Sequence, residues 1–507
     1  MNSRLMMDDD IPEYFIDVSR QLSQCLRHIC PIEETIRRRR EHWAFYEALR
    51  SITDKYSSRC SAFLFGSQTE GSTTPGLQSD TDVALIYNEF VVTKETFEWD
   101  PQRIHCRFLT SDVPPGYVQL QCSERDHILV MAMTSTERDV SLISKWQVEQ
   151  MFFRLQRNIE FALQLQLLLR SQDSIVDMCF AMQMKFREIE LPHCLSRPRT
   201  NKKLLEVLES QEALDDYVNL KYESSPLSFE WKLYFCATER RLVAAFNPVQ
   251  MECYILFKVL VKSFVQPHIG NVLSSYHIKT LMFHTIDSTE ETTWNPNNLL
   301  LCTEMCLKRL SIYVVDGLLQ DYFIPEINLF QDRVCGPVRF RLMVLLKQLL
   351  AEKGRFLLRI ECDRIGDMLA LLSEGKVISG NELVLNTYSF ELTAIRTGRH
   401  LINTFLTNYC YNPFKLIKLL IHDHDHGSNL IKQAAFVLIG EVVKMLGTPQ
   451  YMALWFPKLP LESRKKITTV LLLIGAHSGN NVGSLKLAAI NYIAEEAITA
   501  MQTLELS

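Results

Sequence analysis

The sequence predicts a mixed α+β fold in which a sheet lies between an N-terminal helical segment and a long helical remainder. Apolar residues recur with helical spacing over residues 12–55. Over residues 58–135 they come instead in short bursts separated by Gly, Pro and Asp, which is typical of strands. From about residue 203 helical spacing dominates again. An α/β arrangement is the alternative.

The N-terminal helical segment contains four adjacent arginines, Arg37–Arg40. Neighbouring residues point in different directions around a helix, so these side chains cannot all face one partner. The pattern favours a solvated helix surface over a contact with nucleic acid or phosphate.

The strand-like bursts lie at 62–65, 83–87, 104–109, 117–120 and 128–133. Helical spacing returns over residues 140–170, although a brief Leu/Gln alternation there would also suit a strand. Residues 174–182 form a further strand candidate. After residue 203 we expect helices, interrupted near Pro226 and in the polar segment 287–296.

Composition limits the class of protein. The chain has 507 residues, of which 47% are hydrophobic and 22% charged, as in an ordinary soluble protein of roughly two or three domains. A net charge of −5 means that nucleic-acid binding requires a local basic patch. Fourteen cysteines without a CxxC pair favour a reducing compartment. With no apolar signal segment and no apolar run near the roughly 18–20 residues of a membrane span, we expect a cytoplasmic protein without membrane contact.

A small-residue turn and two aspartates suggest a phosphate and metal site. The turn Gly66-Ser67 follows an apolar run, and Asp80 and Asp82 open the next one. Residues two apart on a strand share a face, so the aspartates would direct two oxygen ligands at one Mg²⁺. The turn offers N–H groups and a hydroxyl to a phosphate. Taken singly, each element is also common in structural turns.

A third carboxylate is expected, because two-metal phosphoryl or nucleotidyl transfer generally needs one more acidic ligand. Asp177 lies near the start of the strand candidate at 174–182 and could be held against the same sheet. An Asp near a strand start is common in purely structural settings as well.

Four segments match a known family, and the order and spacing within the fourth is highly specific to it. They are Gly66-Ser67 through Asp82, Val176–Met182, Trp231–Glu239, and Ser274–Thr280 followed by Trp294 and Asp321–Phe330. In these segments the chain resembles the cyclic GMP-AMP synthase-like receptors of the Mab-twenty-one nucleotidyltransferases. The resemblance covers roughly residues 10–332 and implies a nucleotidyltransferase sheet beside a helical lobe, with the nucleotide pocket between them.

The resemblance also implies roles for individual residues. Asp80, Asp82 and Asp177 would bind catalytic Mg²⁺ or Mn²⁺, and one of them would accept the proton of the attacking ribose hydroxyl. Ser67, beside Gly66, would hold a triphosphate, and Lys258 would contact phosphates. The remaining nucleotide contacts implied are Glu239, Ser275, Tyr276, whose ring would stack on a base, and Lys279.

Three positions of the pocket depart from the family pattern. Lys232 stands in place of a base-binding Arg and loses its planar fork. Tyr234 and Cys236 replace two serines, and a thiol is a poor hydrogen-bond donor. The family's turn before Asp177 is also replaced, by Arg170–Asp173. These changes affect the acceptor nucleotide pocket. The chain lacks the zinc-binding insertion of vertebrate DNA sensors, so no structural zinc is expected.

The function implied is synthesis of a cyclic dinucleotide from ATP and GTP when double-stranded RNA or DNA binds a basic surface, in innate antiviral signalling. A catalytically silent relative that binds a nucleotide or a protein is the main alternative, and a polynucleotide-tailing transferase is another. We expect a helical spine at 1–57, a nucleotidyltransferase core at 58–225, a helical lobe at 226–332 and a helical extension at 333–507. The extension would serve interaction or homodimerisation.

Three other groups of residues invite a functional interpretation. His422–His426 alternates His and Asp, which suits a metal site on a strand, but a polar loop between helices is favoured. Cys302 and Cys306 are favoured as a buried helix face rather than a metal pair. Arg197, Arg199 and Lys202-Lys203 are interpreted as a solvated loop, with a ligand-binding patch as the alternative.

Overall fold

The computed structural model describes residues 13–29, 60–77, 79, 81–87, 90–94, 104–122, 134–137, 140–143, 176–185, 189, 192–214, 217–221, 229–376 and 413–446, with isolated positions from 36 to 52. The chain divides into two compact units. One comprises residues 1–40 and 63–389, and the other residues 41–62 and 390–507. Each unit is described by itself.

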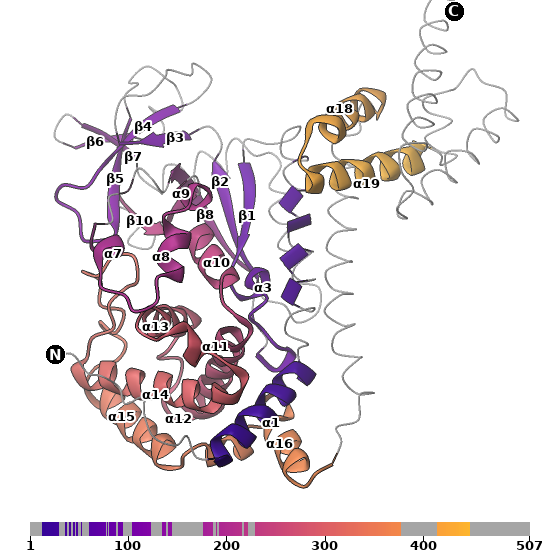
Figure 1. The fold of residues 1–507 in the computed structure, drawn as a ribbon. Coiled ribbons are helices and arrows are strands. Elements are labelled where there is room, and N and C mark those ends of the chain that lie inside the picture. The colour runs from indigo at the N-terminus through magenta and orange to yellow at the C-terminus, as the bar shows by residue number, and fades with distance from the viewer. Residues whose placement is uncertain are drawn as a thin grey trace, which may run out of the picture. The chain divides into compact units, whose positions relative to one another are not determined.

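The first unit is built on a mixed sheet (Figure 1). Its strands run in the order β1 (Cys60–Phe65), β2 (Thr81–Tyr87), β8 (Val176–Lys185), β9 (Tyr217–Lys221), β10 (Glu230–Tyr234), β5 (Tyr117–Cys122), β4 (Ile104–Leu109) and β3 (Phe90–Thr93). A hairpin of β6 (Thr134–Glu137) and β7 (Val140–Ile143) pairs with β5. β2 and β8 are parallel, whereas β9 and β10 pair antiparallel with their neighbours.

The middle of the β2–β8 pair is apolar. Ala84, Ile86 and Ala181 are buried there, and Phe63 and Phe65 of β1 pack against them. Small residues in both strands let aromatic rings cover the pair closely, and Asp82 and Asp177 lie at the strand starts. The sheet therefore holds the beginnings of β2 and β8 in fixed positions.

A group of helices follows β10 in the chain. They include α10 (Cys236–Ala244), α11 (Pro248–Leu260), the π-helix η3 (Val261–Val265), α12 (Gln266–Ile269), α13 (Ser275–Asp287) and α14 (Leu299–Asp316). α11 begins at a capping box of Asn247 and Gln250 followed by Pro248, and is buried along its length. The Ser274 and His277 side chains cap α13 in the same way. These caps fix where the two helices begin beside the sheet.

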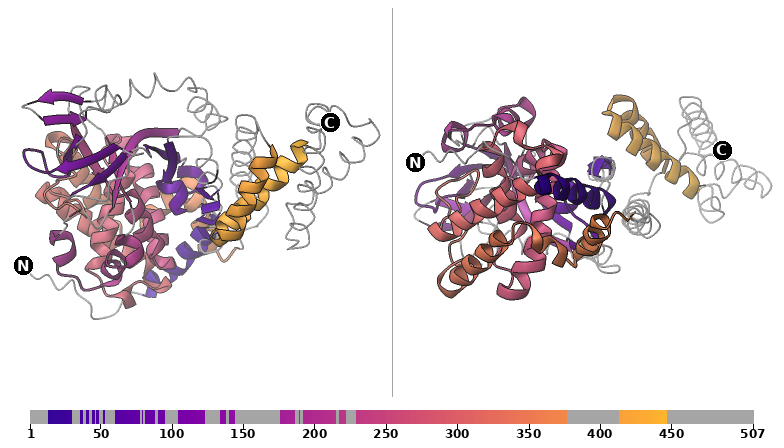
Figure 2. Two further views of the ribbon diagram at one scale, coloured as in Figure 1. Left: turned by 90° about the horizontal axis from the view of Figure 1, so that it is seen from above. Right: turned by 60° about the horizontal axis from the view of Figure 1, so that its bottom comes forward.

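Further helices complete the unit. α1 (Glu13–Ile29) packs against α14 and α16 (Ile365–Ser373), as Figure 2 shows. α15 (Gly336–Ala351), η6 (Arg355–Arg359) and η7 (Cys362–Arg364) connect α14 to α16. Short helices are α3 (Ser67–Glu70), η1 (Pro75–Leu77), α7 (Pro192–Ser196), α8 (Lys203–Leu208), α9 (Gln211–Leu214), η4 (Glu291–Thr293) and η5 (Pro296–Asn298).

In the second unit, α18 (Pro413–His426) and α19 (Asn429–Leu446) form a packed helix pair. Across the described part of the chain, no helix has both the length and the apolar character needed to cross a membrane.

The predicted α+β class is confirmed. Strands expected at 62–65, 83–87, 104–109, 117–120 and 174–182 correspond to β1, β2, β4, β5 and β8. The burst at 128–133 lies outside the described residues. The helical interpretation of residues 140–143 is wrong, because β7 pairs there with β5 and β6. β3, β9 and β10 were not expected, since such short strands owe their conformation to neighbouring strands.

The polar loop expected at His422–His426 is also wrong. The segment forms the last turns of α18. The His426 ring donates from Nδ1 to the His422 carbonyl at 3.0 Å, and the two rings stack with centroids 4.4 Å apart. Contacts between residues four apart thus keep this polar segment helical.

The predicted domain boundaries at 57, 225 and 332 stay predictions. By compactness, the first unit continues past residue 332 to residue 389.

Candidate functional site

In the first unit, a cavity of about 390 Å³ lies between the start of strand β2 and the helices α10 and α13. Its walls come from β2, β10, α10, α13 and the segment from Asp321 to Arg333. The predicted site residues that line it are Gly66, Asp82, Lys232, Tyr234, Cys236, Glu239, Ser275, Tyr276 and Lys279. The fold thus brings residues more than 200 positions apart in the sequence to one cavity.

Asp82 lies directly against the Gly66 turn. A Cβ placed on Gly66 would lie 1.8 Å from Asp82 Oδ2, so no larger residue fits there without moving the carboxylate. Gly66 has φ 82° and ψ −168°, a backbone region that only glycine adopts readily. The turn and the carboxylate therefore form one compact group at the cavity wall.

The parallel register of β2 and β8 sets Asp177 beside Asp82. The two residues are paired Cα partners, each the second residue of its strand. Asp80 lies outside the described residues, as does the side chain of Asp177. Adjacent carboxylate positions with a half-buried Asp82 fit the oxygen ligands that Mg²⁺ or Mn²⁺ prefers. Among the side chains that the structure describes, no group of three or more His, Cys, Asp or Glu gathers as a metal site.

Lys258 ties the turn to α11. Its Nζ donates to Ser67 Oγ at 2.7 Å, to the Ser72 carbonyl at 2.8 Å and to Ser72 Oγ at 2.9 Å. Ser67 follows the cavity residue Gly66 in the sequence, but neither Ser67 nor Lys258 is among the residues that line the cavity. In this arrangement Lys258 holds Ser67 in place, and a direct contact with phosphate stays a prediction.

Lys279 is buried between two carboxylates. Its Nζ lies 2.5 Å from Glu70 Oε1 and 2.8 Å from Glu239 Oε2. The three side chains are at most 10% exposed. Glu70 also accepts a hydrogen bond from Ser72 Oγ at 3.2 Å. This network connects α3, α10 and α13 behind the cavity.

The protonation of the two carboxylates differs. Burial favours a raised pKa for Glu70, but the charges of Lys279 and Lys258 outweigh it and lower that pKa. Burial raises the pKa of Glu239, the Lys279 charge offsets this only in part, and Glu70 raises it further. One lysine cannot fully stabilise two buried anions, so Glu239 is the group that more readily holds a proton at the cavity wall.

Tyr276 is held by a residue that the sequence did not single out as functional. Its hydroxyl donates to Asp321 Oδ2 at 2.7 Å, while Asp321 Oδ1 accepts from the Phe323 and Ile324 amides at 2.8 and 3.0 Å. Burial raises the Asp321 pKa against these hydrogen bonds. Asp321 therefore fixes the ring of Tyr276 at the cavity wall.

The three positions that depart from the family pattern, Lys232, Tyr234 and Cys236, line the cavity near β10. Lys232 Nζ lies 5.3 Å from the ring centroid of Tyr234, and Cys236 is buried at the start of α10. Arg333 also lines the cavity. Glu70, Asp321 and Arg333 were missed, and only their position within or beside the four matching segments could have drawn attention to them.

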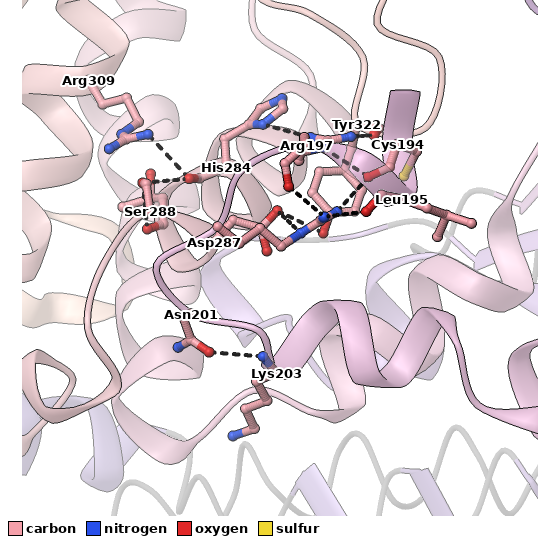
Figure 3. A network of polar contacts seen from close by, with 12 residues as sticks. Cys194, Leu195, Arg197, Asn201, Lys203, His284, Asp287, Ser288, Arg309 and Tyr322 are labelled. Carbon is pink, nitrogen blue, oxygen red and sulfur yellow. Dashed lines mark hydrogen bonds and ion pairs between the residues drawn. The ribbon is translucent and has the colours of Figure 1, made fainter. Parts of the chain in front are cut away.

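Arg197 and Arg199 serve internal contacts, so neither predicted role fits these two arginines; Figure 3 shows the contacts around Arg197. Arg199 Nε lies 2.9 Å from Asp287 Oδ2, with both side chains at most 5% exposed. The Arg197 guanidinium donates to His284 Nδ1 at 3.1 Å and to the Tyr322 carbonyl, and covers the Tyr322 ring. Both contacts join this segment to α13 and to the residues after α14.

Arg40 is likewise not a solvated surface residue. Its guanidinium donates to the carbonyls of Glu70 at 3.0 Å and of Val243 at 3.3 Å. The expected burial of Cys302 and Cys306 in a helix face is confirmed in α14.

Residues 249–335 match the family model described as the Mab-21 protein HhH/H2TH-like domain. The matched range runs from α11 to the residue before α15 and contains Lys258, Ser275, Tyr276 and Lys279. This similarity supports a relationship to the Mab-21 family, which includes nucleotidyltransferases. The matched residues form part of the helical side of the cavity. The candidate site residues on the sheet side lie outside the matched range and are supported by the geometry described above.

Proposed function

We propose that the chain is a metal-dependent nucleotidyltransferase that joins ATP and GTP into a cyclic dinucleotide. The observation that carries the proposal is the convergence at one cavity. The Gly66 turn and Asp82 reach it from the sheet, and Ser275 and Tyr276 reach it from the helical segment similar to Mab-21 proteins. Such a combination suits a triphosphate on the sheet side and a base on the helical side.

Each group has a role in this reaction. Asp82, with Asp80 and Asp177, would hold Mg²⁺ or Mn²⁺. The bound ion would neutralise charge on the phosphates and aid ionisation of the ribose hydroxyl. The hydroxyl would attack the α-phosphate in line with the departing pyrophosphate, and one carboxylate would take the hydroxyl proton. The Ser67 turn, positioned by Lys258, would cradle the triphosphate.

The helical wall would orient the bases. The ring of Tyr276 is fixed by Asp321 and offers a face for stacking. Lys232 and Arg333 provide positive charge at the wall of the same cavity. Glu239, which lines the cavity beside Lys279, would accept hydrogen bonds from a nucleotide.

The biological setting follows from the family resemblance. Double-stranded RNA or DNA would activate the enzyme, and the product would act in cytoplasmic antiviral signalling. Because the whole chain carries a net charge of −5, such a ligand would need a local basic surface. The helices after residue 333 would support homodimerisation, and no structural zinc is proposed.

The test is a product assay with labelled ATP and GTP, Mg²⁺ or Mn²⁺, and double-stranded RNA or DNA. A cyclic product that disappears in Asp82→Asn, alone or with Asp80→Asn, would support the proposal. The matched control is Asp367→Asn, an exposed aspartate outside the cavity. No product with any activator, despite measurable nucleotide binding, would refute it. A linear, primer-attached product would indicate a tailing transferase.

A catalytically silent relative is the second candidate. Lys232, Tyr234 and Cys236 favour it, because they replace a bidentate donor and two hydroxyls in the acceptor part of the cavity. Restoring them together with Lys232→Arg, Tyr234→Ser and Cys236→Ser separates the two cases. Product formed only by the restored variant would identify the natural chain as silent.

A further inference from the structure

A segment beyond the Mab-21-like range reaches back to the loop between the phosphate turn and the metal-binding strand. We call residues 72–77 and 79 the linking loop, since they join α3 to β2. Asp363 of η7 accepts a hydrogen bond from Thr74 Oγ1 at 2.5 Å on one oxygen and from the Gly76 amide at 2.7 Å on the other. The two residues that donate to Asp363 are 289 and 287 positions away from it in the sequence.

A second side chain, Lys262, also holds the loop backbone at Gly76. Lys262 of η3 donates from Nζ to the carbonyls of Gly76 at 2.7 Å and of Leu77 at 3.1 Å. A Cβ on Gly76 would lie 2.7 Å from the Asp363 carboxyl group, so the close approach depends on glycine. The loop backbone at Gly76 therefore has its donor and its acceptor satisfied by charged side chains from other elements.

The backbone of η7 is shaped around this contact. Asp363 has φ 54° and ψ 18°, and Arg364 has φ 57° and ψ 30°. Two successive non-glycine residues in the left-handed region are strained, and such strain persists where surrounding contacts require it. At Asp363 the contacts with the linking loop supply that requirement.

The held part of the loop connects to the metal-binding strand. Thr73 Oγ1 lies 2.6 Å from Ser79 Oγ, and Gln68 Nε2 donates to the Ser79 carbonyl at 2.8 Å. Ser79 is three residues before Asp82. Displacing the loop at Thr74 and Gly76 would therefore shift the start of β2, where the metal-binding carboxylates begin.

We propose that Asp363 is a positioning residue that clamps the linking loop and so sets the metal-binding carboxylates for a metal-bound nucleoside triphosphate. The proposal rests on the proposed function for the role of those carboxylates, but the clamp itself does not. It assigns to residues outside the Mab-21-like range a part in building the site.

The decisive variant is Asp363→Gly, because glycine relieves the left-handed strain while removing the carboxylate. We expect hydrogen exchange of the linking-loop amides to rise roughly tenfold, with no loss of thermal stability. Binding of Mn²⁺ with a non-hydrolysable ATP analogue should weaken roughly fivefold. Asp363→Asn keeps one acceptor oxygen, so its loop exchange and its Mn²⁺–nucleotide binding should lie between those of the wild type and Asp363→Gly. Thr74→Val removes one of the two hydrogen bonds and should have a smaller effect.

The control is Asp367→Ala in the same segment, whose side chain is 69% exposed and lies 3.5 Å from Arg364. It should leave exchange and binding unchanged. Loop exchange in Asp363→Gly equal to wild type, or a rise spread evenly over the unit, would overturn the clamp. Raised loop exchange with unchanged Mn²⁺–nucleotide binding would overturn its positioning role. Absence of any product from the wild type would refute the proposed enzyme and leave these two readouts to judge the clamp.

Discussion

Replacing Lys279 by Met should destabilise the first unit strongly and in a pH-dependent way. Lys279 lies within 2.8 Å of both Glu70 and Glu239, and all three side chains are at most 10% exposed. Met has a similar length and fills the same space, so the main loss is the positive charge. Two buried carboxylates would then face each other without their cation.

The structure sets the size of the effect. Removing one partner of a buried ion pair costs about 3–5 kcal/mol. Glu239 has a pKa already raised by burial and can take a proton, and Glu70 keeps the Ser72 hydroxyl. We therefore expect the lower end, about 3 kcal/mol, near neutral pH. Replacing Glu70 by Gln in the same chain should recover about half of that loss.

The sign of the pH dependence follows from Glu70. In the wild type Lys279 and Lys258 outweigh burial and lower the pKa of Glu70, so its stabilising contribution is present above its unfolded pKa and is lost as pH falls through the folded one. Without Lys279, only Lys258 and the Ser72 hydroxyl oppose burial, so we expect this pKa to rise. The cost of the substitution should then shrink to about 1 kcal/mol near pH 5, where a proton replaces the lysine.

Urea unfolding followed by tryptophan fluorescence, at about pH 7.5 and about pH 5, measures this difference. Lys308→Met is the matched control, because Lys308 is 51% exposed and lies 3.9 Å from Glu304. It should change the free energy of unfolding by less than about 0.5 kcal/mol. A Lys279→Met cost below about 1 kcal/mol at neutral pH, or one that does not fall in acid, would refute the reasoning.

Three further predictions concern single positions. Gly66→Ala should reduce nucleotide binding by roughly a hundredfold, because the new Cβ displaces the Asp82 carboxylate, whereas Gly270→Ala, at similar φ with nothing within 4 Å, should cost only stability. Equal binding by the two variants would contradict this. Burial lowers the pKa of His284 to about 4, so stability falls as pH drops from about 6.5 to about 4. His284→Gln should remove about 3 kcal/mol of that dependence in urea unfolding, and an unchanged profile would count against it. Tyr276→Phe removes the hydroxyl that donates to Oδ2 of the buried Asp321 and should lower the melting temperature by several degrees, measured by calorimetry.

Much of the candidate site could be predicted because its chemistry is local in sequence. Gly66 and Asp82 were identified from a short pattern, Tyr276 and Lys279 from the family resemblance, and the structure places all four at one cavity. The supporting residues were harder to find. Glu70 and Asp321 act through partners more than 40 positions away, and a lone acidic residue in a sequence carries no sign of such a partner.

The secondary structure, too, was predictable from the sequence only in part. The apolar bursts predicted β1, β2, β4, β5 and β8, since runs buried in a sheet show in composition. β9 and β10 are five residues long and hold their conformation through pairing with each other and with β8 and β5. The His and Asp residues at 422–426 suggested a loop, but contacts one helical turn apart keep them in α18.

By itself the sequence determined the α+β class and the residue types of the candidate metal and phosphate site. It did so because hydrophobic periodicity and a carboxylate pair beside a glycine turn are local properties. Only the tertiary structure decided that Asp177 aligns with Asp82, that Lys279 balances two buried acids, and that Asp363 holds the linking loop. These are contacts between distant segments, and they form only when strand register and helix packing bring the segments together.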